Sequence, residues 1–178
     1  TRRPQGETLP TSGGYELGGY RDRSSGRPTF RPRRFHAMVA QTMQVTRISN
    51  RARFEAAFVM GARILLETRD AVESAGARYL LMVVPSEFQV DREVALAGAA
   101  SKGAELSEYE IDWPQKRFEK FCERNEVACL DLLPAFRERG EEEKLYRLRN
   151  SHWNAIGQAV AVEELVSWVI RERQEERR

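Results

Sequence analysis

The segment from Tyr79 to Val84 sets the strongest limit on how this chain can fold. It is a run of six apolar residues without a polar interruption, and it ends at Pro85. A half-buried strand alternates apolar and polar residues, whereas a continuous apolar run is typical of a strand that is covered on both faces. Such strands belong to parallel sheets that lie between layers of helices. We therefore expect a buried parallel strand here, with helices on both sides of it.

Segments with the apolar spacing of helices come before and after this run. Residues 35–48 and 54–72 show the three- and four-residue steps of amphipathic helices, and Gly76 is placed to end the second one in a left-handed conformation. A second buried strand is expected at residues 127–130. A helix that opens near Pro114 precedes it, because proline is tolerated in the first helical turn.

The remaining segments complete an alternating order of helices and strands. Residues 87–110 favour one helix that Gly98 and Gly103 end, and a last helix follows Asn154, its expected N-cap. This order predicts a three-layer α/β/α domain with a parallel, flavodoxin-like sheet. Two strands cannot complete such a sheet, so we expect the chain to be the C-terminal part of a larger domain. Its exposed sheet edge would be covered by a partner segment or by a second copy of the chain.

Residues 1–34 differ in composition from the rest of the chain. They hold six of the 12 glycines, four of the seven prolines and eight arginines. Few apolar residues are present there to offset the entropy cost of ordering the backbone. We expect a basic arm or loop, either a solvated connector or a contact for phosphate or lipid headgroups. Residues 35–178 are expected to form the α/β part.

Composition and charge exclude several classes of protein. A net charge of +2 over 178 residues gives no reason to expect nucleic-acid binding. No stretch approaches the roughly 18 apolar residues of a transmembrane helix. Cys122 and Cys129 lack the spacing of metal ligands and are expected to be buried thiols, with a disulfide as the alternative. The chain shows no signal peptide, so its compartment stays open, with export or membrane tethering through a further N-terminal segment as one hypothesis.

The candidate functional residues follow the expected strands. Open parallel sheets bind ligands beyond the carboxyl ends of their strands. Pro85 and Ser86 come directly after the first strand and are candidates for substrate binding. Asp131 follows the second strand, and the segment from Asn150 to His152 leads into the last helix. We expect these three segments to converge at one edge of the sheet.

His152 is the strongest candidate for a catalytic group. It lies just before a helix, where the positive end of the helix dipole disfavours the imidazolium ion and keeps the ring able to accept a proton. A neutral histidine at this edge of the sheet is suited to act as a general base. The alternative is a loop histidine that makes structural hydrogen bonds. Trp153 is expected either to cover the helix end or to shape a substrate pocket.

The block Asn150-Ser151-His152-Trp153-Asn154-Ala155-Ile156-Gly157 resembles the last conserved block of the SGNH (GDSL-type) hydrolases. Residues 80–85 and 129–134 resemble other stretches of that family, and the resemblance spans roughly residues 35–170. It implies an ester hydrolase or acyl transferase that acts on ester or O-acetyl groups of a carbohydrate or lipid and needs no metal or organic cofactor. His152 would be the general base for a serine. Asn150 would stand where the family has the aspartate that orients the histidine.

Two features depart from that family. No Gly-Asp-Ser block is present, so the nucleophilic serine is expected to lie outside this chain. Asn150 is an amide, which cannot stabilise an imidazolium ion and can hold the wrong tautomer. A catalytically impaired SGNH-like module that binds a glycan or a protein is therefore the alternative. A weaker one is an unrelated flavodoxin-like domain with a phosphate site at residues 85–87, because no Gly-rich loop follows a strand.

Overall fold

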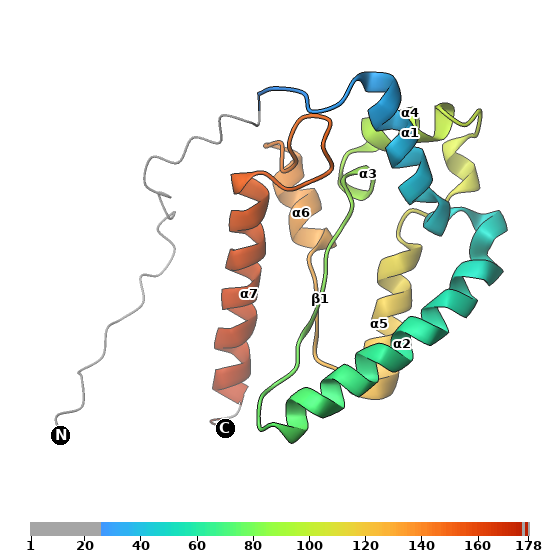
Figure 1. The fold of residues 1–178 in the computed structure, drawn as a ribbon. Helices are drawn as coiled ribbons and strands as arrows, with labels where there is room; N and C mark the ends of the chain where they lie inside the picture. Colours follow the sequence, from blue (N-terminus) through green and yellow to red (C-terminus); the bar gives the residue numbers. More distant parts are fainter. Residues whose placement is uncertain (1–25, 176, 178) are drawn as a thin grey trace.

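The computed structural model of the protein describes residues 26–175 and residue 177. Its helices and strands, in chain order, are α1 (Pro32–Thr42), α2 (Arg51–Ser74), β1 (Leu81–Val83), α3 (Glu87–Val90), α4 (Arg92–Ala100), α5 (Trp113–Asn125), β2 (Cys129–Asp131), α6 (Leu133–Gly140) and α7 (Ala155–Glu175). Short 3-10 helices at 43–46, 48–50 and 106–108 join some of them. Figure 1 shows the strand pair at the centre, with α7 on one side and α2 and α5 on the other.

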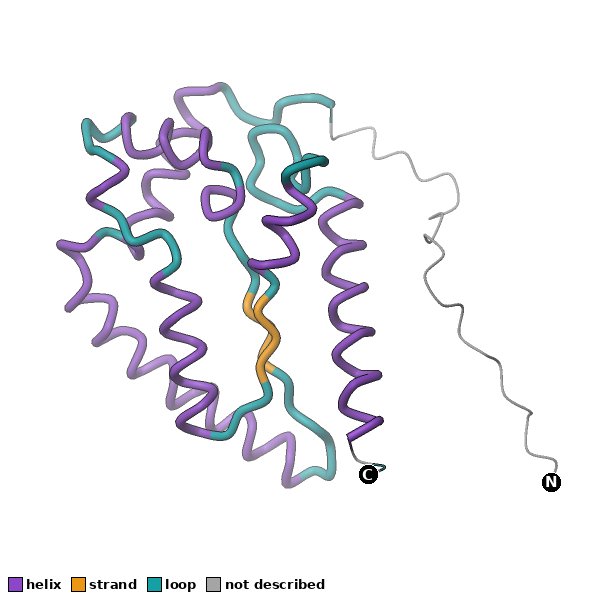
Figure 2. Tube along the Cα trace, turned by 180° about the vertical axis from the view of Figure 1, so that it is seen from behind, coloured by secondary structure: helices purple, strands orange, loops and turns teal. Residues whose placement is uncertain are grey.

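The two expected strands form and pair in parallel. Leu81 lies opposite Cys129, and Val83 lies opposite Asp131. The Leu81 N–H donates to the carbonyl of Ala128 (2.9 Å). Both strands are short, and Figure 2 shows them as a small central element among much longer helices.

The expectation of a three-layer α/β/α fold is wrong. The described residues are mostly helical, and their only sheet has two strands of three residues each. The other apolar segments of the chain follow helical spacing, so their backbone N–H and C=O groups are satisfied inside helices and cannot extend the sheet. An alternating order of helices and strands therefore predicted the parallel pairing correctly but not the size of the sheet.

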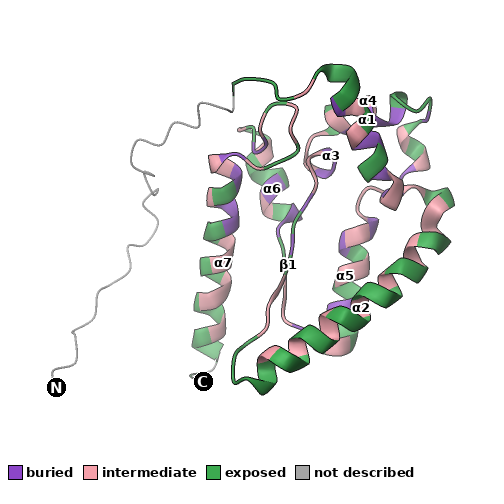
Figure 3. Cartoon of the chain, viewed as in Figure 1, coloured by how far each residue is buried: buried purple, intermediate pink, exposed green. Residues whose placement is uncertain are grey.

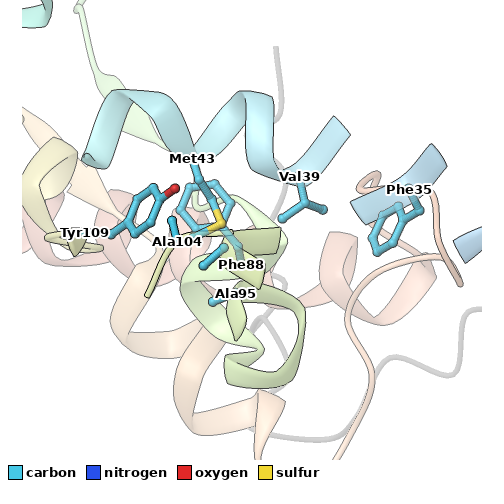
Figure 4. Close-up of a cluster of buried hydrophobic side chains, with 8 residues drawn as sticks. Phe35, Val39, Met43, Phe88, Ala95, Ala104 and Tyr109 are labelled. Carbon is cyan, nitrogen blue, oxygen red and sulfur yellow. The ribbon is translucent and has the colours of Figure 1, made fainter. Parts of the chain in front are cut away.

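One apolar core lies between α1 and α4. Figure 4 shows Met43, just after α1, against Phe88 and Ala95, with Val39 and Phe35 farther back along α1. Gly98 makes the close approach of the two helices possible. A Cβ at this glycine would lie 2.7 Å from the Met43 sulfur and 2.7 Å from a Val39 methyl group. Gly98 is therefore an interior residue of α4 and does not end it, contrary to the sequence prediction.

Two further cores cover the two faces of the strand pair. On one face Leu130 packs with Phe136 and Val160, the latter from α7. On the other face Phe121 and Val127 pack against half-buried residues of α2 and β1. Burial of apolar surface on both faces is the main force that holds a parallel strand pair in place. Leu80 and Leu81 of the apolar run each lie half-buried against one of these cores, whereas Met82 and Val84 are exposed, so the expected burial on both faces holds only in part.

Cys122 and Cys129 form a disulfide that joins α5 to β2. The expectation of two buried thiols is therefore wrong. The two residues are seven positions apart in the sequence, and the turn from α5 into β2 brings them together. Glu126 makes this turn with a left-handed backbone (φ +52°).

Several predicted helix ends agree with the structure, and others do not. Gly76 follows α2 in the left-handed region (φ +76°), as expected. Residues 87–110, expected as one helix, divide into α3 and α4 because the Asp91 side chain caps α4 through the N–H groups of Glu93 and Val94. Gly103 has a left-handed backbone (φ +64°) three residues after α4. Of the arm expected at residues 1–34, residues 1–25 lie outside the described residues.

Long helices leave apolar side chains exposed around the small sheet. None of the residues of α2 is fully buried, and Figure 3 shows that helix as exposed or half-buried along its length. The large exposed apolar residues on α2, β1 and α7 include Val59, Met60, Ile64, Met82, Val162, Val166 and Ile170. No described helix is long and apolar enough to cross a membrane.

Candidate functional site

A tight hairpin carries the candidate base into the start of α7. Tyr146 and Trp153 form an antiparallel bridge, and the Arg147 N–H donates to the carbonyl of His152 (2.9 Å). The Asn150 N–H donates to the Arg147 carbonyl (3.1 Å). These bonds close a short loop over residues 147–152, so His152 is held by the backbone on both sides of the loop.

Two residues of this loop have left-handed backbones without being glycine. They are Arg149 (φ +52°) and Ser151 (φ +57°), and they stand on either side of Asn150. Each such residue costs about 1–2 kcal/mol, so the conformation persists only where surrounding contacts hold it. Non-glycine residues in this region cluster at functional sites. Here the two turns bring the side chains of Asn150 and His152 to the same side of the loop.

The imidazole of His152 is oriented by Asn150. Its Nδ1 lies 2.5 Å from the Asn150 side-chain oxygen and 3.1 Å from the Asn150 carbonyl oxygen. Both oxygens only accept hydrogen bonds, so Nδ1 carries the proton in this arrangement. The hydrogen bond made by the N–H end of the Asn150 amide fixes which end of the amide faces the ring. The lone pair of the neutral ring is then on Nε2. Asn150 therefore sets the tautomer that a general base needs. An amide can also hold the wrong tautomer, but in this arrangement it does not. Asn150 brings no negative charge to the ring.

Thr29 holds the other side of the Asn150 amide. The Asn150 side-chain N–H donates to the Thr29 hydroxyl (2.7 Å), and the Thr29 N–H donates to the Leu148 carbonyl (3.1 Å). A segment before α1 thus lies along the loop. Sequence reasoning missed Thr29, because nothing in a stretch rich in Gly, Pro and Arg marks one threonine as the partner of a residue 121 positions later.

The residues after His152 anchor the loop to the core. The ring of Trp153 packs on that of Phe136, with 5.3 Å between the ring centroids. Asn154 is the N-cap of α7, as predicted, since its side-chain oxygen accepts from the Gly157 N–H (3.0 Å). A Cβ at Gly157 would lie 2.5 Å from the Leu145 carbonyl oxygen, so only glycine fits there.

The hydrogen-bonded pair of Asn150 and His152 opens onto solvent. A shallow hollow of about 520 Å³ is lined by Arg147, Asn150, Ser151, His152, Trp153 and Gln158. The His152 side chain is exposed, so a substrate can reach Nε2 without a rearrangement of the loop. Within the described part of the chain, His152 has no carboxylate ion-pair partner.

A larger groove of about 800 Å³ lies beside this hollow. Its lining includes Glu87, Lys144 and Tyr146, but neither Asn150 nor His152. Ion pairs cross it, such as Lys144 with Asp91 (2.7 Å). We place the candidate site at the smaller hollow, because only that hollow contains the hydrogen-bonded pair.

The segment after β1 reaches the hairpin, as the sequence predicted. The Tyr146 hydroxyl donates to the Pro85 carbonyl (2.9 Å). Neither Pro85 nor Ser86 lines the hollow around His152. Pro85 is buried, and Ser86 forms the capping box of α3 with Gln89. Both residues therefore position the loop and do not face the space a substrate would occupy.

Asp131 does not join the His152 hollow. Its carboxylate accepts the N–H of Leu133 (3.0 Å) at the start of α6, and it lines a separate depression with Asp112 and Arg137. Burial raises the pKa of Asp131, and Asp112 adds to that effect. Asp131 is thus not placed to supply the negative charge that Asn150 lacks.

The described residues contain no group of three His, Cys, Asp or Glu side chains that could hold a metal ion. Comparison of the chain with protein-family models, with curated proteins and with solved structures found no match. The resemblance of residues 150–157 to the SGNH hydrolases therefore stays a prediction, and the functional argument depends on the site itself.

Proposed function

We propose that His152 is the general base of an acyl-transfer site that hydrolyses or transfers ester or O-acetyl groups of a carbohydrate or lipid. The observation that carries the proposal is the hydrogen bond from His152 Nδ1 to the Asn150 side-chain oxygen. It leaves Nε2 as an exposed proton acceptor. A catalytic histidine oriented by an amide side chain is known from cysteine proteases with a Cys-His-Asn arrangement.

In the proposed reaction Nε2 takes the proton of a hydroxyl group while the hydroxyl oxygen bonds to the acyl carbon. The electron pair of the acyl C=O moves onto its oxygen. When this intermediate collapses, the bond to the leaving alcohol breaks, and Nε2–H returns the proton to that alcohol. Water then repeats the sequence and releases the acid. The chain supplies the base and its orientation, with no metal or organic cofactor in the scheme.

The nucleophilic serine is expected from a segment outside this chain. The two serines nearest to the site are already engaged, since Ser86 caps α3 and the Ser151 hydroxyl donates to the Asn150 carbonyl (2.6 Å). The free edge of β1 is the place where we expect that segment to bind. Leu81 and Val83 direct their backbone groups to β2, so those of Leu80 and Met82 point to the opposite edge.

Exposed apolar side chains on β1 and on the helices at either side of the strand pair favour an added strand. Met82 is 36% exposed on β1, while Ile64 of α2 and Val162 of α7 are 63% and 57% exposed. A strand of a partner segment would satisfy the free backbone groups and cover part of this apolar surface. A second copy of the chain is the other candidate, and the molar mass in solution distinguishes the two.

Hydrolysis of p-nitrophenyl acetate tests the proposed base directly, because water can replace the serine. We expect His152→Ala to lower the rate above background by at least about tenfold. The chain has only one other histidine, and His36→Ala is therefore the matched control, expected to keep the wild-type rate. Equal rates for the wild type and His152→Ala would remove His152 from the mechanism.

A binding module without catalysis is the second candidate. The observation that favours it is the lack of a carboxylate facing Nδ1, because an amide stabilises the imidazolium ion less well. In that case titration calorimetry would detect binding of an acetylated oligosaccharide, and the oligosaccharide would keep its acetyl groups during the experiment.

A further inference from the structure

We infer that Thr29 is a positioning residue for the His152 base: residues 27–31, which we call the strap, bring its hydroxyl onto the Asn150 amide, and that amide faces the His152 ring. The inference rests on the proposed function for its catalytic meaning. The contact itself is a property of the folded chain, so the two can be tested apart.

The strap is held at the end that leads into α1. Phe30 is half-buried against the core between α1 and α4, and the Arg34 guanidinium lies 4.8 Å from the centroid of its ring. The residue before a proline is biased toward an extended backbone, and Arg31, before Pro32, has one (φ −64°, ψ 147°). The sequence therefore leads the strap into α1 in an extended conformation, with Phe30 as its apolar anchor.

Thr29 joins the strap to the hairpin through two hydrogen bonds. Its N–H donates to the Leu148 carbonyl (3.1 Å), and its hydroxyl accepts from the Asn150 side-chain N–H (2.7 Å). Figure 1 shows this segment, just before α1, passing beside the loop that leads into α7. The backbone bond fixes the place of Thr29 along the hairpin, and its side chain then reaches the amide.

The Asn150 amide transmits the position of Thr29 to His152. The backbone carbonyl of Asn150 lies 3.1 Å from His152 Nδ1 and can only accept, so Nδ1 carries the proton. The amide oxygen accepts from the same Nδ1 (2.5 Å), which turns the N–H end of the amide toward Thr29. The last side-chain torsion of asparagine has broad minima, so an amide bound at one end only can rotate. The Thr29 hydroxyl binds the second end.

No other group replaces Thr29 in this contact. Within residues 26–175, the Asn150 side-chain N–H donates to Thr29 alone. His152 and most of the strap are exposed, so water competes for each of these hydrogen bonds. A segment with few buried contacts opens locally at low cost, and an open strap would release the amide. The tautomer of His152 is therefore expected to depend on whether the strap is bound to the hairpin.

Nitrogen NMR of the neutral His152 ring tests this inference without an enzyme assay. Thr29→Val removes the hydroxyl but keeps the branched shape and the backbone N–H. We expect the share of the Nε2–H tautomer to rise at least about fivefold over the wild type. Thr29→Ser keeps the hydroxyl and should restore the wild-type tautomer. An unchanged tautomer in Thr29→Val would overturn the inference.

Thr68→Val is the matched control for the loss of a hydroxyl. Thr68 is an exposed threonine on α2, and its hydroxyl donates to the Ile64 carbonyl (2.7 Å), far from the hairpin in the sequence. The same substitution there should leave the His152 tautomer unchanged. A shift of the tautomer in Thr68→Val equal to that in Thr29→Val would also overturn the inference, because the effect would then not come from the strap.

Two further readouts keep the test decisive. If Thr29→Val does not fold, hydrogen exchange of the wild-type protein replaces it: the Thr29 amide should exchange at least about tenfold more slowly than in an unfolded peptide, and an unprotected amide would refute the binding of the strap. Hydrolysis of p-nitrophenyl acetate separates the two proposals. If the tautomer shifts as expected but His152→Ala keeps the wild-type rate, the proposed function fails and the positioning contact stands.

Discussion

Replacing Glu87 by glutamine is expected to remove a pH-dependent loss of stability from the protein. Burial, with the neighbouring Asp91 carboxylate, raises the pKa of Glu87 to about 7 in the folded state from an ordinary value of 4.5. Below pH 4.5 the group is protonated in both states and costs nothing. As the pH rises from 4.5 through 7, the unfolded chain ionises more readily than the folded one, so the folded state loses stability.

The size of this effect follows from the two pKa values. The difference between about 7 and 4.5 is about 2.5 pH units, and each unit is worth about 1.4 kcal/mol, so the upper bound is about 3 kcal/mol above pH 7. Glu87 is only partly buried, and solvent screening lowers this bound. We therefore expect an effect of about 1–2 kcal/mol. Glutamine keeps the shape of the side chain but never ionises.

Urea unfolding at pH 5 and pH 8 measures the effect. The free energy of unfolding of Glu87→Gln, relative to the wild type, should be about 1–2 kcal/mol higher at pH 8 than at pH 5. Asp131 and the other titrating groups that do not face Glu87 are present in both proteins and cancel in this comparison. Glu93→Gln, at an exposed glutamate, should show no such change. Parallel pH profiles for the wild type and Glu87→Gln would refute the reasoning.

Three other changes are predicted to have defined effects. Asn150→Asp should raise the rate of p-nitrophenyl acetate hydrolysis above the wild-type rate, because a carboxylate facing Nδ1 stabilises the imidazolium ion; an unchanged or lower rate would mean that Asn150 is not the orienting group. Gly157→Ala should lower the free energy of unfolding by about 1–3 kcal/mol in urea titrations, because its Cβ would meet the Leu145 carbonyl. Reduction of the disulfide between Cys122 and Cys129 should cost about 2 kcal/mol of stability and lower the melting temperature in calorimetry, whereas a Tm insensitive to reductant would contradict the bond.

Local features of the fold were predictable at positions where only a few residue types meet the physical requirement. Gly76 stands in the left-handed region after α2, and Asn154 caps α7, because few other residues do either task well. The run from Tyr79 to Val84 also indicated its own environment. Leu80 lies in the core with α7, and Tyr79 and Leu81 lie in the core with α2 and α5, but Met82 and Val84 are exposed, so the run is not covered along its whole length.

Tertiary contacts were not predictable in the same way. Gly98 was expected to end a helix, but it serves the packing of α1 on α4, which no local pattern reveals. The number of strands in the sheet depends on which segments pair, and within residues 26–175 helical spacing elsewhere leaves only two. Cys122 and Cys129 were expected to be thiols because spacing alone does not show that a turn brings them together.

The central residues of the candidate site were predictable from the sequence, but the residues that hold them in place were not. The order Asn150, Ser151, His152 suggested an orienting group two residues before a base, and the structure places the two side chains in contact. The hydrogen bond from the Asn150 amide to the Thr29 hydroxyl depends on a segment far away in the sequence. Asp131, expected at the same edge, instead accepts the N–H of Leu133 at the start of α6.

The protonation of the His152 ring is the most direct test of the central claim that Asn150 sets this residue up as a base. Nitrogen NMR of the imidazole, at a pH where the ring is neutral, distinguishes its two tautomers. The account predicts a proton on Nδ1 and a free Nε2 in the wild type, with a mixture of tautomers in Asn150→Ala. A neutral ring that carries its proton on Nε2 in the wild type would contradict the account, because no lone pair would then face the substrate.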